Sequence, residues 1–99
     1  MKLVVTDPAK ERLKDIHDYY KHKANLQIAD KIKSGIIEKL KFVKEFPLTG
    51  QEEEHLIELN LGHRRMVEGN YKIIYRINQD IIYVTDIFDS RQDPSKMYG

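Results

Sequence analysis

The chain contains no cysteine and no tryptophan, and only three of its 99 residues are proline. The lack of cysteine excludes disulfides, thiolate metal ligands and cysteine nucleophiles, and with them the small secreted disulfide scaffolds. No stretch approaches the roughly 18 consecutive apolar residues of a membrane span. The opening residues MKLVVTDP lack the apolar segment of a signal peptide. We therefore expect a single cytoplasmic domain over residues 1–99, with no cofactor.

Neither sign of charge is in excess over the whole chain. Lysine and arginine number 17 against 16 aspartates and glutamates, which gives a net charge of +1. The halves differ, because residues 1–50 hold 11 basic and 7 acidic side chains whereas residues 51–99 hold 6 and 9. A nearly neutral chain argues against a general polyanion binder. The segment Gly62–Ile77 is basic, however, so the sequence leaves room for a local anion site.

The first half of the chain has the pattern of a strand followed by two helices. Lys2–Thr6 is apolar and β-branched, which favours a short strand. We expect Asp7 and Pro8 to be the N-cap and the first residue of a helix, and Asn25 to cap a second helix. A polar break between the two helices is short enough to make them an antiparallel hairpin. The apolar faces with helical spacing are Ala9, Leu13, Ile16 and Tyr20, and then Ala29, Ile32, Ile36, Leu40 and Val43.

After Gly62 the period of the apolar residues changes from helical to two, which indicates strands. His63–Val67 and Tyr71–Ile77 alternate on either side of a glycine-containing turn, and Ile81–Phe88 is nearly all apolar, as in an interior strand buried on both faces. The segment Gln51–Leu61 is left open between a loop and a turn of helix. The element order is then β-α-α-β-β-β. This is an α+β fold with a helical hairpin packed on one face of a small, mostly antiparallel sheet.

The alternation also predicts which side chains point away from the helices. If Tyr71 and Tyr75 face the helices as core aromatics, the alternating residues Lys72, Ile74 and Arg76 lie on the other face, which we expect to be uncovered. Val67 and Ile74 are apolar positions among these cations. Such a surface is either a solvated face that keeps the sheet soluble or a place where an extended partner segment adds. This cationic strip consists of His63, Arg65, Lys72 and Arg76.

Other features of the sequence favour structural roles. The acidic run Glu52–Glu54 is expected to be a solvated loop. The four histidines do not have the spacing of a metal site, so we expect no metal. No serine lies in the sequence context of a nucleophile, and the five glycines are isolated rather than grouped in a phosphate-binding loop. Arg91 either pairs with a neighbouring aspartate, Asp89 or Asp93, or serves a functional site.

The segment HRRMVEGNYKIIYRI, followed by IIYVTDIFDSRQDPSKMY, resembles the RelE/ParE superfamily of toxins from type II toxin–antitoxin systems. The shared pattern is a basic strand, a glycine turn, two tyrosines around a basic and two aliphatic residues, an apolar strand, an arginine and a late tyrosine. The upstream hairpin, ending in Phe-Pro-Leu-Thr-Gly, also fits, so that the resemblance covers nearly the whole chain. It implies a toxin of a plasmid-stabilisation or growth-control module, neutralised by a cognate antitoxin.

The resemblance implies one of two targets. A RelE-like toxin is a metal-independent endoribonuclease that cuts mRNA on the ribosome. For that chemistry the matching positions are Arg65, Lys72 and Arg91 around the phosphate, with His63 or Tyr98 to move a proton. A ParE-like toxin instead inhibits DNA gyrase and is not an enzyme.

The ParE-like alternative is favoured, because this sequence departs from the RelE pattern. Arginine cannot act as a base, Lys72 lacks the bidentate geometry of arginine, and Asp86, Asp89 and Asp93 surround Arg91 with negative charge. An inactive relative that only binds the antitoxin is a third alternative. A homodimer is expected as one form of the toxin when it is free of antitoxin. The candidate antitoxin contacts are Arg65, Val67, Ile74 and Arg76.

Overall fold

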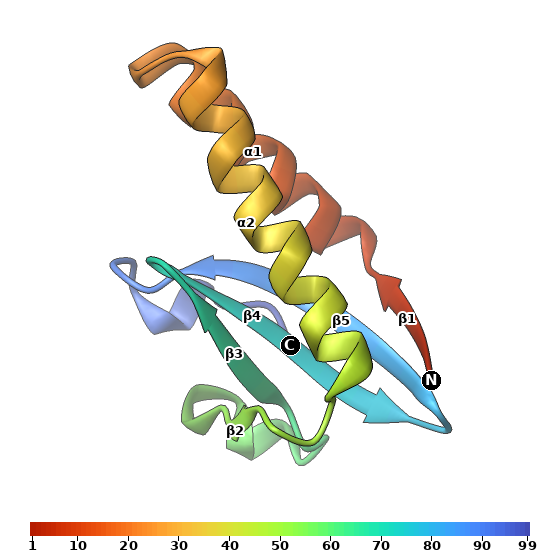
Figure 1. The fold of residues 1–99 in the computed structure, drawn as a ribbon. Helices are drawn as coiled ribbons and strands as arrows, with labels where there is room; N and C mark the ends of the chain where they lie inside the picture. The colour runs from red at the N-terminus through yellow and green to blue at the C-terminus, as the bar shows by residue number, and fades with distance from the viewer.

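The computed structural model describes all residues from 1 to 99 and contains two long helices, five strands and two short 3-10 helices (Figure 1). The predicted order of strands and helices is confirmed, with one very short strand and one 3-10 helix added in the segment that the sequence left open. In chain order the elements are β1 (Lys2–Val5), α1 (Asp7–Lys23), α2 (Leu26–Glu45), β2 (Gln51–Glu52), η1 (Glu54–Leu59), β3 (Arg64–Glu68), β4 (Tyr71–Asn78), β5 (Ile81–Asp89) and η2 (Pro94–Lys96).

The strands form one sheet in the order β1-β5-β4-β3-β2. β1 runs parallel to β5, and every other neighbouring pair is antiparallel. Two tight turns close the hairpins. Gly69 takes a positive φ of 58° between β3 and β4, and Gln79 and Asp80 take φ values of 51° and 63° between β4 and β5. In the turn between β4 and β5 both central residues thus have a positive φ, which matches the twist of a two-residue hairpin, whereas the turn between β3 and β4 has a positive φ at Gly69 alone.

Both helices begin at a side-chain cap. Asn25 accepts a hydrogen bond from the backbone N–H of Ile28 at 2.9 Å, as the sequence predicted. For α1 the predicted cap was wrong by one residue: Thr6 is the N-cap and accepts from Ala9, while Asp7 lies in the first turn. A carboxylate in the first turn still interacts favourably with the helix dipole, so Asp7 remains well placed there.

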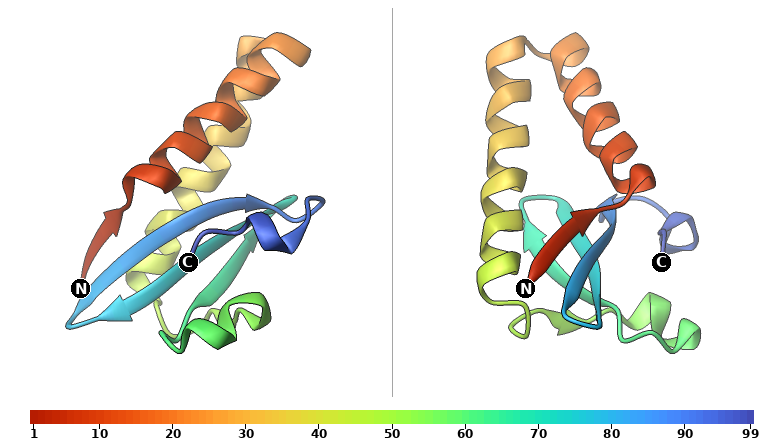
Figure 2. Two further views of the ribbon diagram at one scale, coloured as in Figure 1. Left: turned by 180° about the vertical axis from the view of Figure 1, so that it is seen from behind. Right: turned by 90° about the vertical axis from the view of Figure 1, so that its right-hand side faces the viewer.

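The helical hairpin covers one face of the sheet and continues well beyond it (Figure 2). The core between the two layers contains Ala9, Ile36 and Val43 from the helices, and the remaining partners come from β4 and β5. Leu26 and Ile28, at the far end of the hairpin, are about half exposed. Neither helix is long and apolar enough to cross a membrane.

The opposite face of the sheet is not uncovered, contrary to the prediction from sequence. On this distal face, η1 and the segment after β5 pack over the strands (Figure 2). The sequence left η1 open between a loop and a turn of helix, and the segment after β5 is mostly polar, so neither showed which face of the sheet it covers. A second, smaller apolar cluster lies beneath them and contains Leu56, Ile74, Phe88 and Met97.

Candidate functional site

Three members of the cationic strip, Arg65, Lys72 and Arg76, project from the distal face of the sheet, as the alternation predicted. Arg65 on β3 stands opposite Ile74 on β4, and Val67 stands opposite Lys72. Directly opposed residues of an antiparallel pair share a face. Met66 and Tyr75 belong to the other face, with the helices. The strip therefore exists as a geometric row, and what its cations contact decides what it can do.

A buried carboxylate occupies the middle of the strip. The Glu53 side chain is fully buried, with Oε1 at 3.1 Å from Lys72 Nζ and at 3.8 Å from an Arg65 guanidinium nitrogen. Its Oε2 accepts a hydrogen bond of 3.0 Å from the backbone N–H of His55 at the start of η1. The prediction that Glu52–Glu54 is a solvated loop is thus wrong for Glu53. Two cations of the strip already have their counter-charge.

These contacts set the charge state of Glu53. Burial alone raises the pKa of a carboxyl group. Here the His55 N–H and the charges of Lys72 and Arg65 outweigh burial, and the pKa of Glu53 lies below its usual value of 4.5. The group is therefore ionised near neutral pH, and it holds Lys72 and Arg65 in a compensated cluster rather than as free phosphate ligands.

His63 lies under cover. It is only 2% exposed, and neither ring nitrogen has a hydrogen-bond partner. Burial and the nearby charge of Arg76 lower its pKa, so the ring is neutral at physiological pH. A β-carbon placed on Gly99 would lie 3.5 Å from His63 Nε2, which shows how closely the end of the chain approaches the ring. The expectation that His63 lies on an open face is therefore wrong.

Arg91 lies on the other side of the sheet from Arg65 and Lys72. Asp89 is paired with Tyr71, which faces the helices. The Arg91 guanidinium binds the Asp89 carboxylate through two nitrogens, at 2.9 and 2.8 Å. This pairing raises the pKa of Arg91 and lowers that of Asp89. The alternative that Arg91 pairs with a neighbouring aspartate is thus confirmed.

A bulge in β5 explains why Arg91 lies on the opposite face of the sheet from Arg65 and Lys72. Val84 stands opposite Tyr75, but the next residue of β4, Ile74, stands opposite Asp86, so that Thr85 is the extra residue. One extra residue reverses the face of every side chain that follows it. As a result Asp89 and the Arg91 bound to it turn to the helix side. The five residues of the predicted nuclease site are not brought together.

The carboxylate of Asp86 instead turns to the distal face and anchors the end of the chain. It is fully buried, 3.2 Å from Arg12 Nε, and it accepts a 2.9 Å hydrogen bond from the backbone N–H of Tyr98. Arg12 also donates to the carbonyl of Lys96 at 2.8 Å and stacks over the Tyr98 ring at 4.2 Å. The Tyr98 ring is therefore in contact with the Arg12 guanidinium. The only sequence signal for this cluster was an acid within the apolar run of β5.

Replacing Arg12 by alanine is expected to lower the free energy of unfolding by about 2–3 kcal/mol, because it leaves Asp86 buried without its partner. Burial already raises the pKa of Asp86 against the opposing effects of Tyr98 and Arg12. Urea denaturation measures the loss, and hydrogen exchange should become faster in residues 96–99. Glu11→Ala on the same helix is the control. An Arg12 variant as stable as this control would show that the cluster does not hold the chain end.

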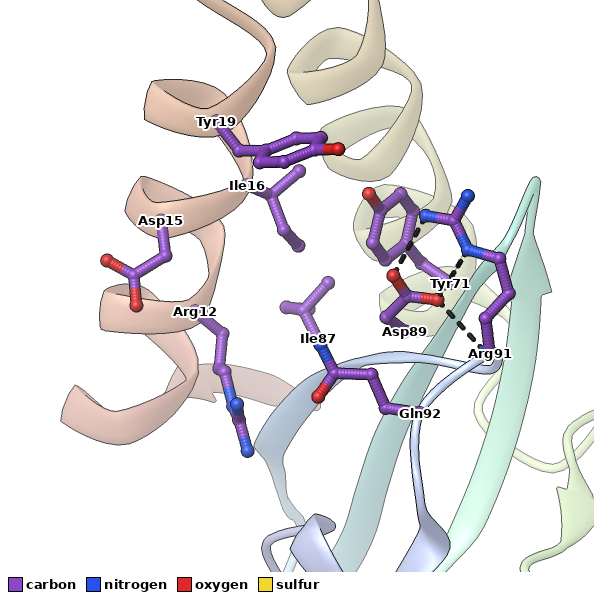
Figure 3. Close-up of a pocket in the computed structure, with 9 residues that line it drawn as sticks. All are labelled: Arg12, Asp15, Ile16, Tyr19, Tyr71, Ile87, Asp89, Arg91 and Gln92. Carbon is purple, nitrogen blue, oxygen red and sulfur yellow. Dashed lines mark hydrogen bonds and ion pairs between the residues drawn. The ribbon is translucent and has the colours of Figure 1, made fainter. Parts of the chain in front are cut away.

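A pocket of about 410 Å³ opens between α1 and the end of β5 (Figure 3). β1 pairs with β5 only as far as Val84, so residues 85–89 have no strand partner on this side. Arg12 and Arg91 lie on opposite walls of the pocket, with Tyr19 above them (Figure 3). Because each guanidinium is paired with a carboxylate, the pocket is a mixed surface with room for a partner's side chain rather than a concentrated anion site.

The four candidate antitoxin contacts differ in accessibility. Val67 is 57% exposed and stands on the part of β3 that β2 does not pair with. Arg65 is partly exposed, and Arg76 packs over the Tyr83 ring at 5.0 Å. Ile74 is fully buried in the distal cluster. The expectation that Ile74 lies on an open surface is therefore wrong.

Comparison with known proteins agrees with this architecture. The sequence matches the family described as ParE toxin of type II toxin-antitoxin system, parDE, over residues 3–94. A solved structure described as the chromosomal ParDE TA system from P. aeruginosa is similar in fold, with a TM-score of 0.75 and 21% identity over 90% of this chain and 95% of that chain. No curated protein shows significant similarity. The resemblance seen in the sequence is confirmed on its ParE side, and the chain belongs to the ParE toxin family of type II toxin–antitoxin systems.

Proposed function

We propose that this toxin acts by binding and inhibiting DNA gyrase, without catalysing RNA cleavage. The observation that carries the proposal is the separation and pairing of the candidate catalytic residues. Arg65 and Lys72 are held by Glu53 on one face of the sheet, whereas Arg91 is held by Asp89 on the other. Stabilising a scissile phosphate needs cations that are free and that converge on one point. Arg65, Lys72 and Arg91 meet neither condition, and inhibition by binding needs neither.

The antitoxin is the second partner in this proposal. The outer edge of β3 offers it a place, because β2 pairs only with Arg64 and Arg65 and leaves residues 66–68 without a strand neighbour on the side away from β4. An extended antitoxin segment would add to this edge by main-chain hydrogen bonds and would cover Val67. Protection of the β3 backbone from hydrogen exchange, on adding the antitoxin encoded beside the toxin gene, tests this placement. The same exposed edge favours self-association of the free toxin.

The first experiment is pulse-labelling after induction in a bacterial host that lacks the antitoxin. We expect thymidine incorporation to fall within minutes while amino-acid incorporation continues, and purified toxin to block supercoiling by purified gyrase. If amino-acid incorporation stops first, the chain is instead a ribosome-dependent endoribonuclease. If neither falls, it is an inactive relative that only binds antitoxin.

A double variant separates the two toxin mechanisms at the level of residues. Arg65→Ala combined with Arg91→Ala removes two of the cations that RNA cleavage would require. We expect growth inhibition to be retained, because neither side chain is needed to inhibit by binding. The measurement is the growth curve after induction, with thermal unfolding to verify that the variant is folded. Loss of toxicity in a folded variant that still binds antitoxin would favour the nuclease.

A further inference from the structure

The groove between the two long helices carries positive charge that the fold does not use. Its hollow of about 260 Å³ is lined only by α1 and α2, without any residue of the sheet. Four of the five lining side chains are basic or histidine, and none is acidic. This helical groove is formed by Lys10, Leu13, Lys14, His17 and Lys33.

The three lysines of the helical groove have no counter-ion. Lys10, Lys14 and Lys33 are exposed and are absent from every ion pair within 4.0 Å. The acid beside them, Asp30, is bonded to His17 at 2.7 Å. By contrast, Glu53 pairs with Arg65 and Lys72 of the sheet, and Asp89 pairs with Arg91. The helical groove is therefore a place where three cations without an acidic partner lie close together.

The spacing of these lysines suits a row of anions. Lys10 and Lys14 are one helical turn apart, about 6 Å along the axis of α1. Asp18 follows on the same side of α1, so the basic row of the groove on this helix consists of Lys10 and Lys14. Lys33 faces them from α2, across the hollow. A linear polyanion lying along the hairpin would meet several ammonium groups at once.

The composition of the groove favours phosphates over an acidic protein surface. Leu13 is its only apolar lining residue. Protein interfaces are depleted in lysine, and they depend on buried aromatic and apolar anchors. Lysine ammonium groups, in contrast, bind phosphates as mobile point charges and gain affinity from released counterions.

We propose that the helical groove binds the phosphate backbone of duplex DNA. The inference rests on the proposed function, since gyrase works on DNA and a toxin bound to gyrase would lie beside it. The groove would then contact the DNA that gyrase holds, while other surfaces of the toxin contact the enzyme.

The test is the binding of purified toxin to a short fluorescent DNA duplex, measured by anisotropy at several salt concentrations. Three lysine–phosphate contacts predict a loss of affinity of about 40-fold between 50 and 200 mM salt. The variant Lys10→Gln, Lys14→Gln, Lys33→Gln should lose at least about tenfold in affinity at low salt, with nearly all of its salt dependence. Lys2→Gln, Lys23→Gln, Lys31→Gln changes the net charge equally at exposed sites outside the groove, and should bind within about twofold of the wild type.

Three results would overturn the proposal: absence of salt-dependent binding by the wild type, equal loss in both variants, or unchanged binding by the groove variant. If the groove variant binds duplex DNA normally but loses affinity for gyrase free of DNA, the groove contacts acidic protein instead. The supercoiling assay keeps the two proposals apart. Wild-type toxin that binds DNA without inhibiting gyrase refutes the proposed function, whereas inhibition without DNA binding refutes only the role of the groove.

Discussion

Replacing Gly50 by alanine is expected to lower the free energy of unfolding by about 3 kcal/mol, the upper range for overpacking a tight site. A β-carbon at this position would overlap the Tyr75 hydroxyl, and it would approach Tyr75 Cζ to 2.8 Å and the backbone oxygen of Arg65 to 3.0 Å. The Tyr75 hydroxyl cannot move aside without losing two hydrogen bonds. It donates to the carbonyl of Pro47 at 2.7 Å and accepts from the Gly50 N–H at 3.1 Å.

Urea denaturation of three variants tests this account. Tyr75→Phe alone should cost about 1–2 kcal/mol, because it removes the hydrogen bonds to Pro47 and Gly50. The double variant of Gly50→Ala with Tyr75→Phe should be less destabilised than the sum of the single variants, since removing the hydroxyl relieves the worst contact. Leu48→Ala, at a nearby side chain that is 68% exposed, is the control. Strict additivity, or a Gly50 variant as stable as the control, would contradict the predicted overlap.

The elements of this fold were predictable because each one carries a local signal. Ala29, Ile36 and Val43 repeat at helical spacing and are all fully buried, and Asn25 begins that helix as expected. The period of two in β4 and the apolar run of β5 likewise identified two of the three interior strands. Such patterns depend only on neighbours within one element, which the sequence displays directly.

The candidate site was less predictable, because it depends on contacts distant in the sequence. Glu53 reads as one acid in a run of three, and only its pairing with Lys72, 19 residues away, distinguishes it. The bulge at Thr85 cannot be recognised from the sequence, because β5 is largely apolar and shows no alternation that a bulge could interrupt. It nevertheless decides the face of the sheet on which Arg91 lies. The alternation placed His63 correctly on the face away from the helices, but the sequence did not show that the C-terminal end of the chain covers its ring.

The second large effect is expected at Glu53. Glu53→Ala should lower the free energy of unfolding by about 3 kcal/mol, the lower end of the range for breaking a buried ion pair. We choose the lower end because the Lys72 and Arg65 side chains keep 19% and 22% exposure and so retain some water. The variant also removes the acceptor for the His55 N–H at the start of η1. Glu53→Gln is the matched variant, since it keeps the shape and the acceptor and loses only the charge. It should cost about 1–2 kcal/mol.

The pH dependence of these variants identifies the charge as the cause. The pKa of Glu53 in the folded protein lies below its usual 4.5, so its contribution is complete above that pH and is lost as the pH falls through the folded value. The stability difference between wild type and Glu53→Gln should thus be constant from pH 7 to about pH 5. It should then shrink as the pH is lowered further. A difference that stays constant through the acidic range would mean that packing, not the ion pairs with Lys72 and Arg65, makes Glu53 important. In that case Glu53 would not neutralise Lys72 and Arg65, and both cations would be available to a phosphate on this face.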